Sequence, residues 1–364
     1  MDIKTNYTLI GDVREKLKEL PDKSIQMCVT SPPYYALRDY GTAEWEGGNP
    51  NCDHIEILGG RGEKSKKQTT SYGTQATQYK NECKKCNAKR KDNQLGLEDT
   101  LEEFVENMVG VFAEVHRVLR DDGTLWLNLG DSYNSGGAGK NVGGFQGQLH
   151  KKSKDRDKSV IRSSQHKVLK SLPPKSLMGI PWKVAIALQE WGWILRQDII
   201  WAKKNCMPES VKDRFTKNHE YIFLFSKQPK YFFNQIREPA TQVSIDRSKR
   251  KMNFRKITPD KTVYDEAQDP SRVVAADHMR NKRSVWNMRT ASYKEAHFAV
   301  FPPELAETCI KAGSNEKDIV LDCFMGSGTT AMVAQNLFRK WIGVELNPEY
   351  EKLIKKRTAQ QTLF

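Results

Sequence analysis

The order of apolar and polar segments predicts a chain that alternates between buried strands and amphipathic helices. Apolar runs typical of buried strands occupy residues 25–31, 124–132, 193–203, 220–226, 318–324 and 341–346. Apolar residues recur at helical spacing over 97–120, 181–192, 329–340 and 348–357. The sequence DDG at 121–123 is expected to end the first helix before the next strand. This alternation favours an α/β fold with a doubly wound, mostly parallel sheet covered on both faces.

Three polar segments interrupt this pattern. Residues 46–97, 134–175 and 241–290 lack apolar periodicity and hold the whole positive excess of a chain whose net charge is +14. The middle segment has ten basic residues against two acidic ones. Such insertions are either solvated loops or the basic lining of a groove for a polyanion, and charge alone does not separate the two.

The composition excludes several classes of protein. No apolar run approaches the roughly 20 residues that a membrane span needs, and the N-terminus shows no signal-peptide segment. The seven cysteines are too few and too scattered for a disulfide framework. We therefore expect a cytoplasmic protein that makes no membrane contact.

A glycine-rich turn near the C-terminus has the pattern of a cofactor site. The strand ending near Asp322 leads into Gly326-x-Gly328 and a helix, and the following strand ends at Glu345. Glycine lets a ligand approach the backbone closely, and a carboxylate after the second strand can accept hydrogen bonds from ribose hydroxyls. S-adenosylmethionine suits this pattern, but Gly326-x-Gly328-x-x-Ala331 also meets the dinucleotide fingerprint of an oxidoreductase.

The first predicted strand is followed by Ser31-Pro32-Pro33-Tyr34. Prolines fix the backbone and donate no N–H, so carbonyls beside them can face a ligand. The exocyclic amino group of a base is a poor nucleophile, because its lone pair is delocalised into the ring. Acceptors at the Ser31 side chain and the Pro32 carbonyl would favour a tetrahedral nitrogen, and Tyr34 could stack on a flipped base.

These motifs, in this order, resemble the permuted group of DNA amino-methyltransferases, which modify cytosine N4 or adenine N6. In that group the Ser/Asp-Pro-Pro-Tyr motif lies near the N-terminus and the cofactor motif near the C-terminus. Other matching stretches include GTLWLNLGDSY (123–133), SLMGIPWKVAIAL (176–188) and WIGVELNPEY (341–350). The resemblance implies a circularly permuted S-adenosylmethionine-dependent methyltransferase fold, with S-adenosylmethionine as cofactor and double-stranded DNA as partner.

The resemblance also implies roles for individual residues. The catalytic residues would be Ser31, Pro32, Pro33 and Tyr34. The cofactor would be bound by Asp12, His297, Phe298, Pro302, Asp322, Phe324, Gly326, Gly328, Thr329, Glu345 and Asn347. Among these, Asp12 would contact the adenine amino group, Glu345 the ribose, and residues 297–302 would form the wall over the methionine end. Trp201 lies where family members often place a second ring against the flipped base, but it could equally be a core residue.

Several alternatives stay open at this level. Within the resemblance, serine before Pro-Pro-Tyr favours cytosine N4, while adenine N6 remains the alternative. An RNA methyltransferase and an inactive DNA-binding protein are the rival functions. A bacterial or phage setting is implied by the resemblance alone, which also raises a cognate restriction endonuclease as a partner. The oligomeric state is undecided, with a homodimer among the options.

The resemblance divides the chain into a catalytic core and three insertions. The core would comprise 1–45, 98–133, 176–233 and 290–364. Residues 134–175 would form a basic mobile loop, and residues 234–289 would be the candidate target-recognition region. The remaining insertion, 46–97, contains two close pairs of soft ligands.

Those pairs are Cys52-x-His54 and Cys83-x-x-Cys86, separated by 28 residues. Four such ligands could hold a structural zinc ion in tetrahedral geometry and so order a segment too polar to fold alone. The alternative interpretation is unpaired thiols and a surface histidine. No ligand set in the sequence suggests a catalytic metal.

Overall fold

The computed structural model separates the chain into two compact units. It describes residues 3–36, 42–58, 75–78, 82–134, 169, 171–249, 278–293, 296–300 and 302–359. One unit, here called the sheet unit, comprises Met1–Pro32, Val105–Tyr133 and Leu177–Phe364. The other, here called the insertion unit, comprises Pro33–Phe104 and Asn134–Ser176.

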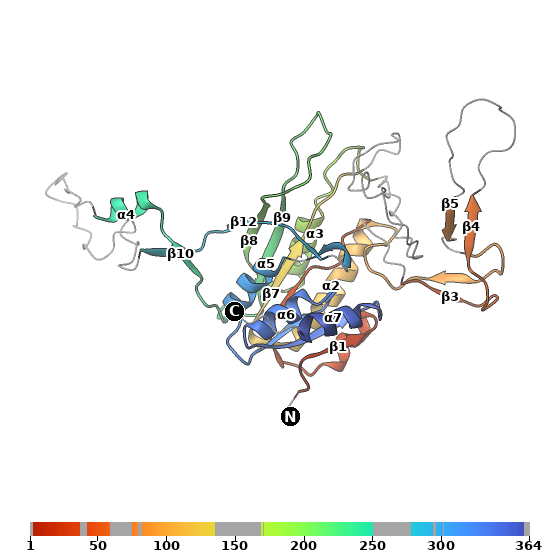
Figure 1. The fold of residues 1–364 in the computed structure, drawn as a ribbon, viewed down its shortest axis with the longest axis horizontal. Helices are drawn as coiled ribbons and strands as arrows, with labels where there is room; N and C mark the ends of the chain where they lie inside the picture. Colours follow the sequence, from red (N-terminus) through yellow and green to blue (C-terminus); the bar gives the residue numbers. More distant parts are fainter. Residues whose placement is uncertain are drawn as a thin grey trace. The chain divides into compact units, whose positions relative to one another are not determined.

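The sheet unit is built on a mixed, mostly parallel sheet (Figure 1). Its strands, in spatial order, are β1 (Tyr7–Ile10), β16 (Lys340–Glu345), β15 (Ile319–Asp322), β2 (Ile25–Thr30), β7 (Leu119–Leu129), β9 (His219–Ser226), β8 (Ile194–Lys203) and β12 (Val285–Met288). Neighbours from β1 to β7 run parallel, β9 is antiparallel to both β7 and β8, and β12 is parallel to β8. The predicted fold class is therefore confirmed.

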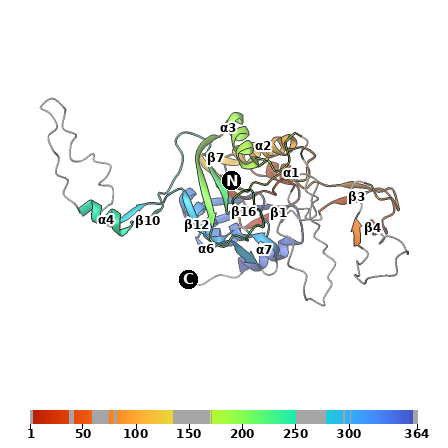
Figure 2. The same ribbon diagram turned by 90° about the horizontal axis from the view of Figure 1, so that it is seen from above.

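Helices cover both faces of this sheet, with α2 and α3 on one side and α6 and α7 on the other (Figure 2). The helices of the unit are α1 (Val13–Lys16), α2 (Leu101–Val118), α3 (Ile180–Trp191), α5 (Pro303–Gly313), α6 (Thr329–Asn336) and α7 (Tyr350–Ala359), with a 3-10 turn at Leu17–Glu19. A core cluster that includes Met27, Trp126, Ile222, Cys309 and Ile354 lies under α5, α6 and α7. The opposite face carries an aromatic layer, in which Trp182 of α3 meets Phe223 of β9 edge-on at 5.1 Å between ring centroids.

One strand begins earlier than its sequence predicts. The helix was predicted to run to residue 120, but α2 ends at Val118 and β7 starts at Leu119, so Asp121, Asp122 and Gly123 lie inside the strand. The pairing with β2 shifts register between Ile25 and Met27, which absorbs the irregular residues. Asp121 can lie within the strand because its carboxylate is exposed to solvent and accepts a hydrogen bond from Lys23 Nζ at 3.0 Å.

The insertion unit contains short antiparallel pairs rather than a large sheet. Strand β3 (Glu44–Glu46) pairs with β6 (Lys89–Lys91), and β4 (Ile55–Leu58) pairs with β5 (Gln75–Gln78). Tyr35 is buried against Phe104, with 5.5 Å between ring centroids. The two ends of the segment from Ala36 to Gly96 are joined by a hydrogen bond, in which the Ala36 N–H donates to the Gly96 carbonyl at 2.8 Å.

The remaining short elements belong to the sheet unit. They are β10 (Arg237–Pro239), α4 (Gln242–Lys249), β11 (Met279–Asn281), β13 (Ala291–Tyr293) and β14 (Ala296–Val300). Strands β10 and β11 pair with each other, as do β13 and β14. No helix in the described part of the chain is long and apolar enough to span a membrane.

The C-terminal helix is attached to the glycine turn by a buried arginine. Arg357 of α7 donates from Nη1 to the hydroxyls of Ser327 and Thr329, both at 2.8 Å. Gly328 of that turn has φ +83°, and a Cβ there would lie 3.1 Å from the Cα of Ile354 in α7. The turn and the helix are therefore packed backbone to backbone, and only glycine fits at this point.

We predict that Arg357→Met lowers the free energy of unfolding by about 1–3 kcal/mol, because it removes the donor that serves two buried hydroxyls. Urea unfolding monitored by tryptophan fluorescence measures the change. Lys352→Met is the matched control, since Lys352 is exposed on the same helix and should change stability by less than about 0.5 kcal/mol. Equal losses in the two variants would contradict the anchoring role.

Candidate active site

Polar residues gather where the parallel strands of the sheet unit end. Asp322 ends β15, Thr30 ends β2 and Glu345 ends β16. Neighbouring parallel strands present their carboxyl ends at one edge, so these side chains lie along the same edge of the sheet. Ligands of open α/β sheets bind at this edge. The two motifs identified at opposite ends of the sequence are therefore brought together.

The Asp322 carboxylate connects the two central strands to the helix that follows. Its Oδ1 accepts from Thr30 Oγ1 at 2.6 Å and from the Phe324 N–H at 3.1 Å, and its Oδ2 accepts from Thr330 Oγ1 at 2.6 Å. Burial raises the pKa of Asp322, and these three hydrogen bonds oppose that rise. The carboxylate therefore fixes the start of the glycine turn through contacts within the protein.

Glu345 presents a carboxylate beside the same turn. Its Oε2 accepts from the Gly326 N–H and its Oε1 from the Asn347 N–H, each at 2.8 Å. Burial raises the pKa of Glu345 to about 7, despite hydrogen bonds from Asn347 and Gly326 that lower it. Each oxygen keeps acceptor capacity, and the residue remains partly exposed. These two acceptor oxygens fit a ligand that carries vicinal hydroxyls.

Asp12 follows β1 next to the end of β16, because the Gly11 N–H donates to the Glu345 carbonyl at 2.9 Å. Its carboxylate caps α1 by accepting from the Arg14 N–H at 2.9 Å, and it pairs with the Arg14 guanidinium at 2.5 Å. Burial alone would raise the pKa of Asp12, but the hydrogen bonds and charge of Arg14 lower it overall. Asp12 is thus placed near Glu345 and is ionised.

The other predicted cofactor residues have different surroundings. Thr329 is buried, and its hydroxyl accepts from Arg357, which indicates a role in packing the turn. The side chain of Asn347 accepts from the Glu349 N–H at 3.0 Å. Pro302 is the N-cap of α5. For His297 and Phe298 the structure describes the backbone in β14, and their side chains lie outside the described part.

Ser31 belongs to a hydrogen-bond network that sequence reasoning missed. Asn128 of β7 donates from Nδ2 to Ser31 Oγ at 3.3 Å and to Glu220 Oε2 of β9 at 3.0 Å. The other oxygen of Glu220 accepts from Lys203 Nζ of β8. Asn128 is only 2% exposed within an apolar strand, and such a polar residue in a buried run is the signal that could have found it.

The boundary between the two units falls within the Ser31-Pro32-Pro33-Tyr34 segment of the chain. Ser31 and Pro32 end the first segment of the sheet unit, and Pro33 and Tyr34 begin the insertion unit. Pro32 is buried, whereas the ring of Tyr34 is partly exposed. Ser31 is also partly exposed, so its hydroxyl lies at the edge of the sheet with one hydrogen bond already fixing its position.

Trp201 lies in the core. It is 4% exposed and belongs to the cluster under α5 and α6. Its Nε1 donates to the Met288 carbonyl at 3.2 Å, and Lys203 Nζ lies 4.9 Å from the ring centroid. Burial and this fixed indole N–H favour the interpretation of Trp201 as a core residue over that of a stacking partner for a base.

A second cluster lies within the insertion unit. The ligand atoms of Cys52, His54, Cys83 and Cys86 all fall within 4.8 Å of one another. The two halves of the predicted metal site are therefore brought together, although 28 residues separate them in the sequence.

Two predicted regions fall largely outside the described residues. Of the basic loop at 134–175, residues 135–168 and 170 are not described. Of the candidate target-recognition region at 234–289, residues 250–277 are not described. Both predictions remain open.

Comparison with known proteins supports the same assignment as the site. A family model described as DNA methylase, of the N6/N4 methyltransferase type, matches residues 25–356. The type II methyltransferase M.SmaI of Serratia marcescens is 37% identical over 355 residues, covering 97% of this chain and 90% of that protein. M.XycI of Xanthomonas campestris pv. cyanopsidis is 38% identical over 353 residues, covering 96% and 87%.

A solved structure shares the fold. The cytosine-N4-specific PvuII DNA methyltransferase superposes with a TM-score of 0.55 over 99% of this chain and 89% of its own, at 18% identity. The predicted family, enzyme class and cofactor are confirmed, and the oxidoreductase alternative is wrong. The chain belongs to the N6/N4 family of DNA methylases and is an S-adenosylmethionine-dependent DNA methyltransferase.

Proposed function

We propose that this enzyme methylates the N4 amino group of cytosine at a specific site in double-stranded DNA. The observation that carries the proposal is Ser31, a hydroxyl rather than a carboxylate, held at the end of β2 by Asn128. The cytosine-N4 specificity of the PvuII enzyme, which has the same fold, supports the same choice.

The Ser31 hydroxyl and the Pro32 carbonyl act as acceptors for the two N–H bonds of the target amino group. Accepting both bonds localises the nitrogen lone pair, which turns a conjugated amine into a nucleophile. Tyr34, three residues along the chain, supplies a ring on which a base outside the duplex can stack. A bond forms between this nitrogen and the methyl carbon as the carbon–sulfur bond breaks, and one amino proton is then lost to water.

The network behind Ser31 keeps its oxygen in place. Asn128 can donate to Ser31 and Glu220 together because Lys203 holds the Glu220 carboxylate from the other side. We assign Asn128, Glu220 and Lys203 as positioning residues, since their contacts act on Ser31 rather than on the reacting atoms. Fixing an acceptor before the reaction removes the need to reorganise it in the transition state.

S-adenosylmethionine supplies the electrophilic methyl group when it is bound. We propose that Glu345 accepts hydrogen bonds from its ribose, that Asp12 contacts its adenine amino group, and that the turn from Phe324 to Gly328 lies against its methionine part. Asp322 shapes that turn through Thr30 and Thr330. Pro302, Asn347 and residues 297–298 complete the proposed set, whereas Thr329 acts through Arg357.

The type II designation of the relatives supports a role beside a restriction endonuclease. We propose that the enzyme protects DNA in the bacterial cytoplasm from an endonuclease of the same specificity. Resistance of methylated DNA to that nuclease, set against cleavage of unmethylated DNA, tests this proposal.

The base assignment is tested by nucleoside mass spectrometry. Unmethylated bacterial DNA is incubated with enzyme and S-adenosylmethionine, digested, and separated alongside authentic standards. We predict N4-methylcytosine as the modified nucleoside, with none formed when the cofactor is left out. N6-methyladenine would overturn the cytosine assignment.

We predict that Ser31→Ala lowers the single-turnover rate of methyl transfer about 100-fold or more, the usual effect of losing one preorganised hydrogen bond in a transition state. The Kd for S-adenosylmethionine, measured by calorimetry, should change less than about twofold. Ser24→Ala is the control, because the exposed Ser24 hydroxyl donates to the Pro21 carbonyl, three residues away, and the substitution leaves the backbone unchanged. A parallel loss of rate and cofactor affinity in Ser31→Ala would contradict the assigned role.

The pKa of Glu345 predicts a pH-dependent cofactor affinity. With a pKa of about 7, the acceptor carboxylate forms as pH rises through 7 and is lost below it. The Kd for S-adenosylmethionine should therefore be up to about tenfold weaker at pH 6 than at pH 8. Glu345→Gln should bind S-adenosylmethionine more weakly and should lose the part of the pH dependence that comes from Glu345. Any pH dependence that comes from titration of the ligand itself should be the same in both proteins. A wild-type pH profile identical to that of the variant would rule out Glu345.

A further inference from the structure

We propose that the insertion unit binds a structural zinc ion through Cys52, His54, Cys83 and Cys86. All four ligand atoms lie within 4.8 Å of one another. Three thiolates and one imidazole form a standard donor set for structural zinc, and soft sulfur ligands favour zinc over hard cations such as magnesium. None of these four residues belongs to the set proposed for methyl transfer or cofactor binding.

Two of the distances between the ligand atoms match those expected around a tetrahedral ion. With Zn–S bonds of about 2.3 Å and Zn–N bonds of about 2.0–2.1 Å, tetrahedral angles place two sulfurs about 3.8 Å apart and a sulfur about 3.6 Å from a nitrogen. Cys52 Sγ and Cys83 Sγ are 3.7 Å apart, and Cys86 Sγ is 3.6 Å from His54 Nδ1. The same sulfur separation far exceeds the roughly 2.05 Å of a disulfide bond.

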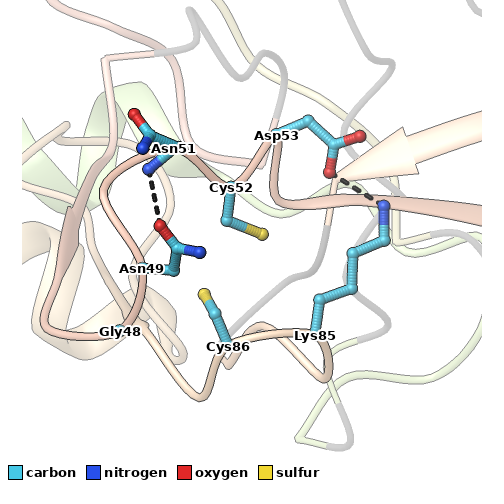
Figure 3. Close-up of a pocket in the computed structure, with 7 residues that line it drawn as sticks. All are labelled: Gly48, Asn49, Asn51, Cys52, Asp53, Lys85 and Cys86. Atoms are coloured by element: carbon cyan, nitrogen blue, oxygen red, sulfur yellow. Dashed lines mark hydrogen bonds and ion pairs between the residues drawn. The ribbon is translucent and has the colours of Figure 1, made fainter.

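The backbone around Cys83-x-x-Cys86 is folded to present both thiols. The Cys83 carbonyl accepts from the N–H groups of Cys86 at 3.3 Å and Asn87 at 2.7 Å, and the Cys83 N–H donates to the Ala88 carbonyl at 2.8 Å. Hydrogen bonds from both the carbonyl and the N–H of Cys83 therefore hold this tight turn. The thiols of Cys52 and Cys86 point into one pocket, beside the ion pair of Asp53 and Lys85 (Figure 3).

Other residues make room for the ligands and orient them. Gly48 has φ +71°, and a Cβ there would lie 2.8 Å from Cys86 Sγ, so the loop passes the thiol at a distance that only glycine permits. The His54 ring stacks on Trp45, with 4.3 Å between centroids and 14° between planes. That contact holds the imidazole with Nδ1 towards the cluster.

Among the described residues around the cluster, the hydrophobic core is small. The hydrophobic cluster here consists of buried Cys83 and Ala88, with Trp45, Cys52 and Cys86 packed against it. Three of these five residues are the proposed ligands themselves. A core this small does not offset the conformational entropy of ordering the loops, whereas zinc coordination contributes folding free energy directly.

The position of the segment indicates what the metal supports. The segment that holds the four ligands begins just after the proposed catalytic motif and ends at Gly96, whose carbonyl accepts from the Ala36 N–H. We therefore expect zinc to hold the insertion unit in the fold that contains Pro33 and Tyr34. Loss of zinc should lower methyl transfer while cofactor binding, assigned to the sheet unit, is retained.

The test begins with the metal content of the full-length protein, purified under reducing conditions without chelator. Inductively coupled plasma mass spectrometry should find about one zinc per chain. Cys83→Ser and Cys86→Ser should each retain less than a fifth of that, whereas Cys206→Ser, a cysteine outside the cluster, should retain it all. His54→Cys should also keep the ion, because four thiolates form an equally good tetrahedral site.

A second measurement does not depend on whether a variant folds. Wild-type protein stripped of metal and titrated with Co²⁺ should show one equivalent of tetrahedral cobalt, with thiolate-to-metal charge-transfer absorption that zinc then displaces. Chelator should lower the melting temperature of the wild type but leave the Kd for S-adenosylmethionine within about twofold.

Three results would overturn the proposal. They are zinc-free wild-type protein that takes up no Co²⁺, equal zinc in Cys83→Ser and wild type, or a Cys52–Cys83 disulfide in peptides mapped from reduced and unreduced samples. None of these readouts depends on which base is methylated, so failure of the zinc site and failure of the cytosine assignment are distinguishable.

Discussion

The buried carboxylate of Asp322 is the interaction on which the arrangement of the active site depends. It accepts from Thr30 at the end of β2 and from Thr330 at the start of α6, and so fixes two strand ends and a helix start relative to one another. Removing a buried carboxylate from water is unfavourable unless its oxygens are satisfied. Here three protein donors satisfy the oxygens, which offsets the penalty of burial and fixes the glycine turn to β2, the strand that leads into Ser31.

The sheet explains how a permuted chain can bring motifs from its two ends to the same edge. β1 and β16 come from opposite ends of the sequence, yet they pair in parallel, with Ile10 opposite Glu345. The order of motifs along the chain is therefore irrelevant to the chemistry, because the carboxyl ends of parallel strands meet at one edge whatever their connections. Long insertions are tolerated where they leave from that edge, since the sheet and its helices already close the core without them.

The sequence patterns predicted what depends on local periodicity and missed what depends on register. The strands at 25–31 and 318–324 and the helix at 181–192 follow from apolar runs and breakers, and all are present. The link from Asn128 to Glu220 was not predicted, because it requires knowing that β9 returns antiparallel beside β7. The start of β7 was misplaced because a turn-forming triplet suggested a break, whereas lysine pairing and a register shift keep those residues in the strand. The two halves of the metal cluster were visible from spacing, but their convergence required the fold.

The two prolines between Ser31 and Tyr34 restrict the chain where one unit ends and the other begins. Ser31 and Pro32 end a segment of the sheet unit, and Pro33 and Tyr34 begin the insertion unit. Consecutive prolines restrict φ at both positions, so the backbone of this short segment has few conformations. On the serine side Asn128 fixes the oxygen, and on the tyrosine side Tyr35 is anchored against Phe104. Ser31 is thus held by a contact within the sheet unit and Tyr35 by a contact within the insertion unit, so each half of this segment depends on the folding of its own unit.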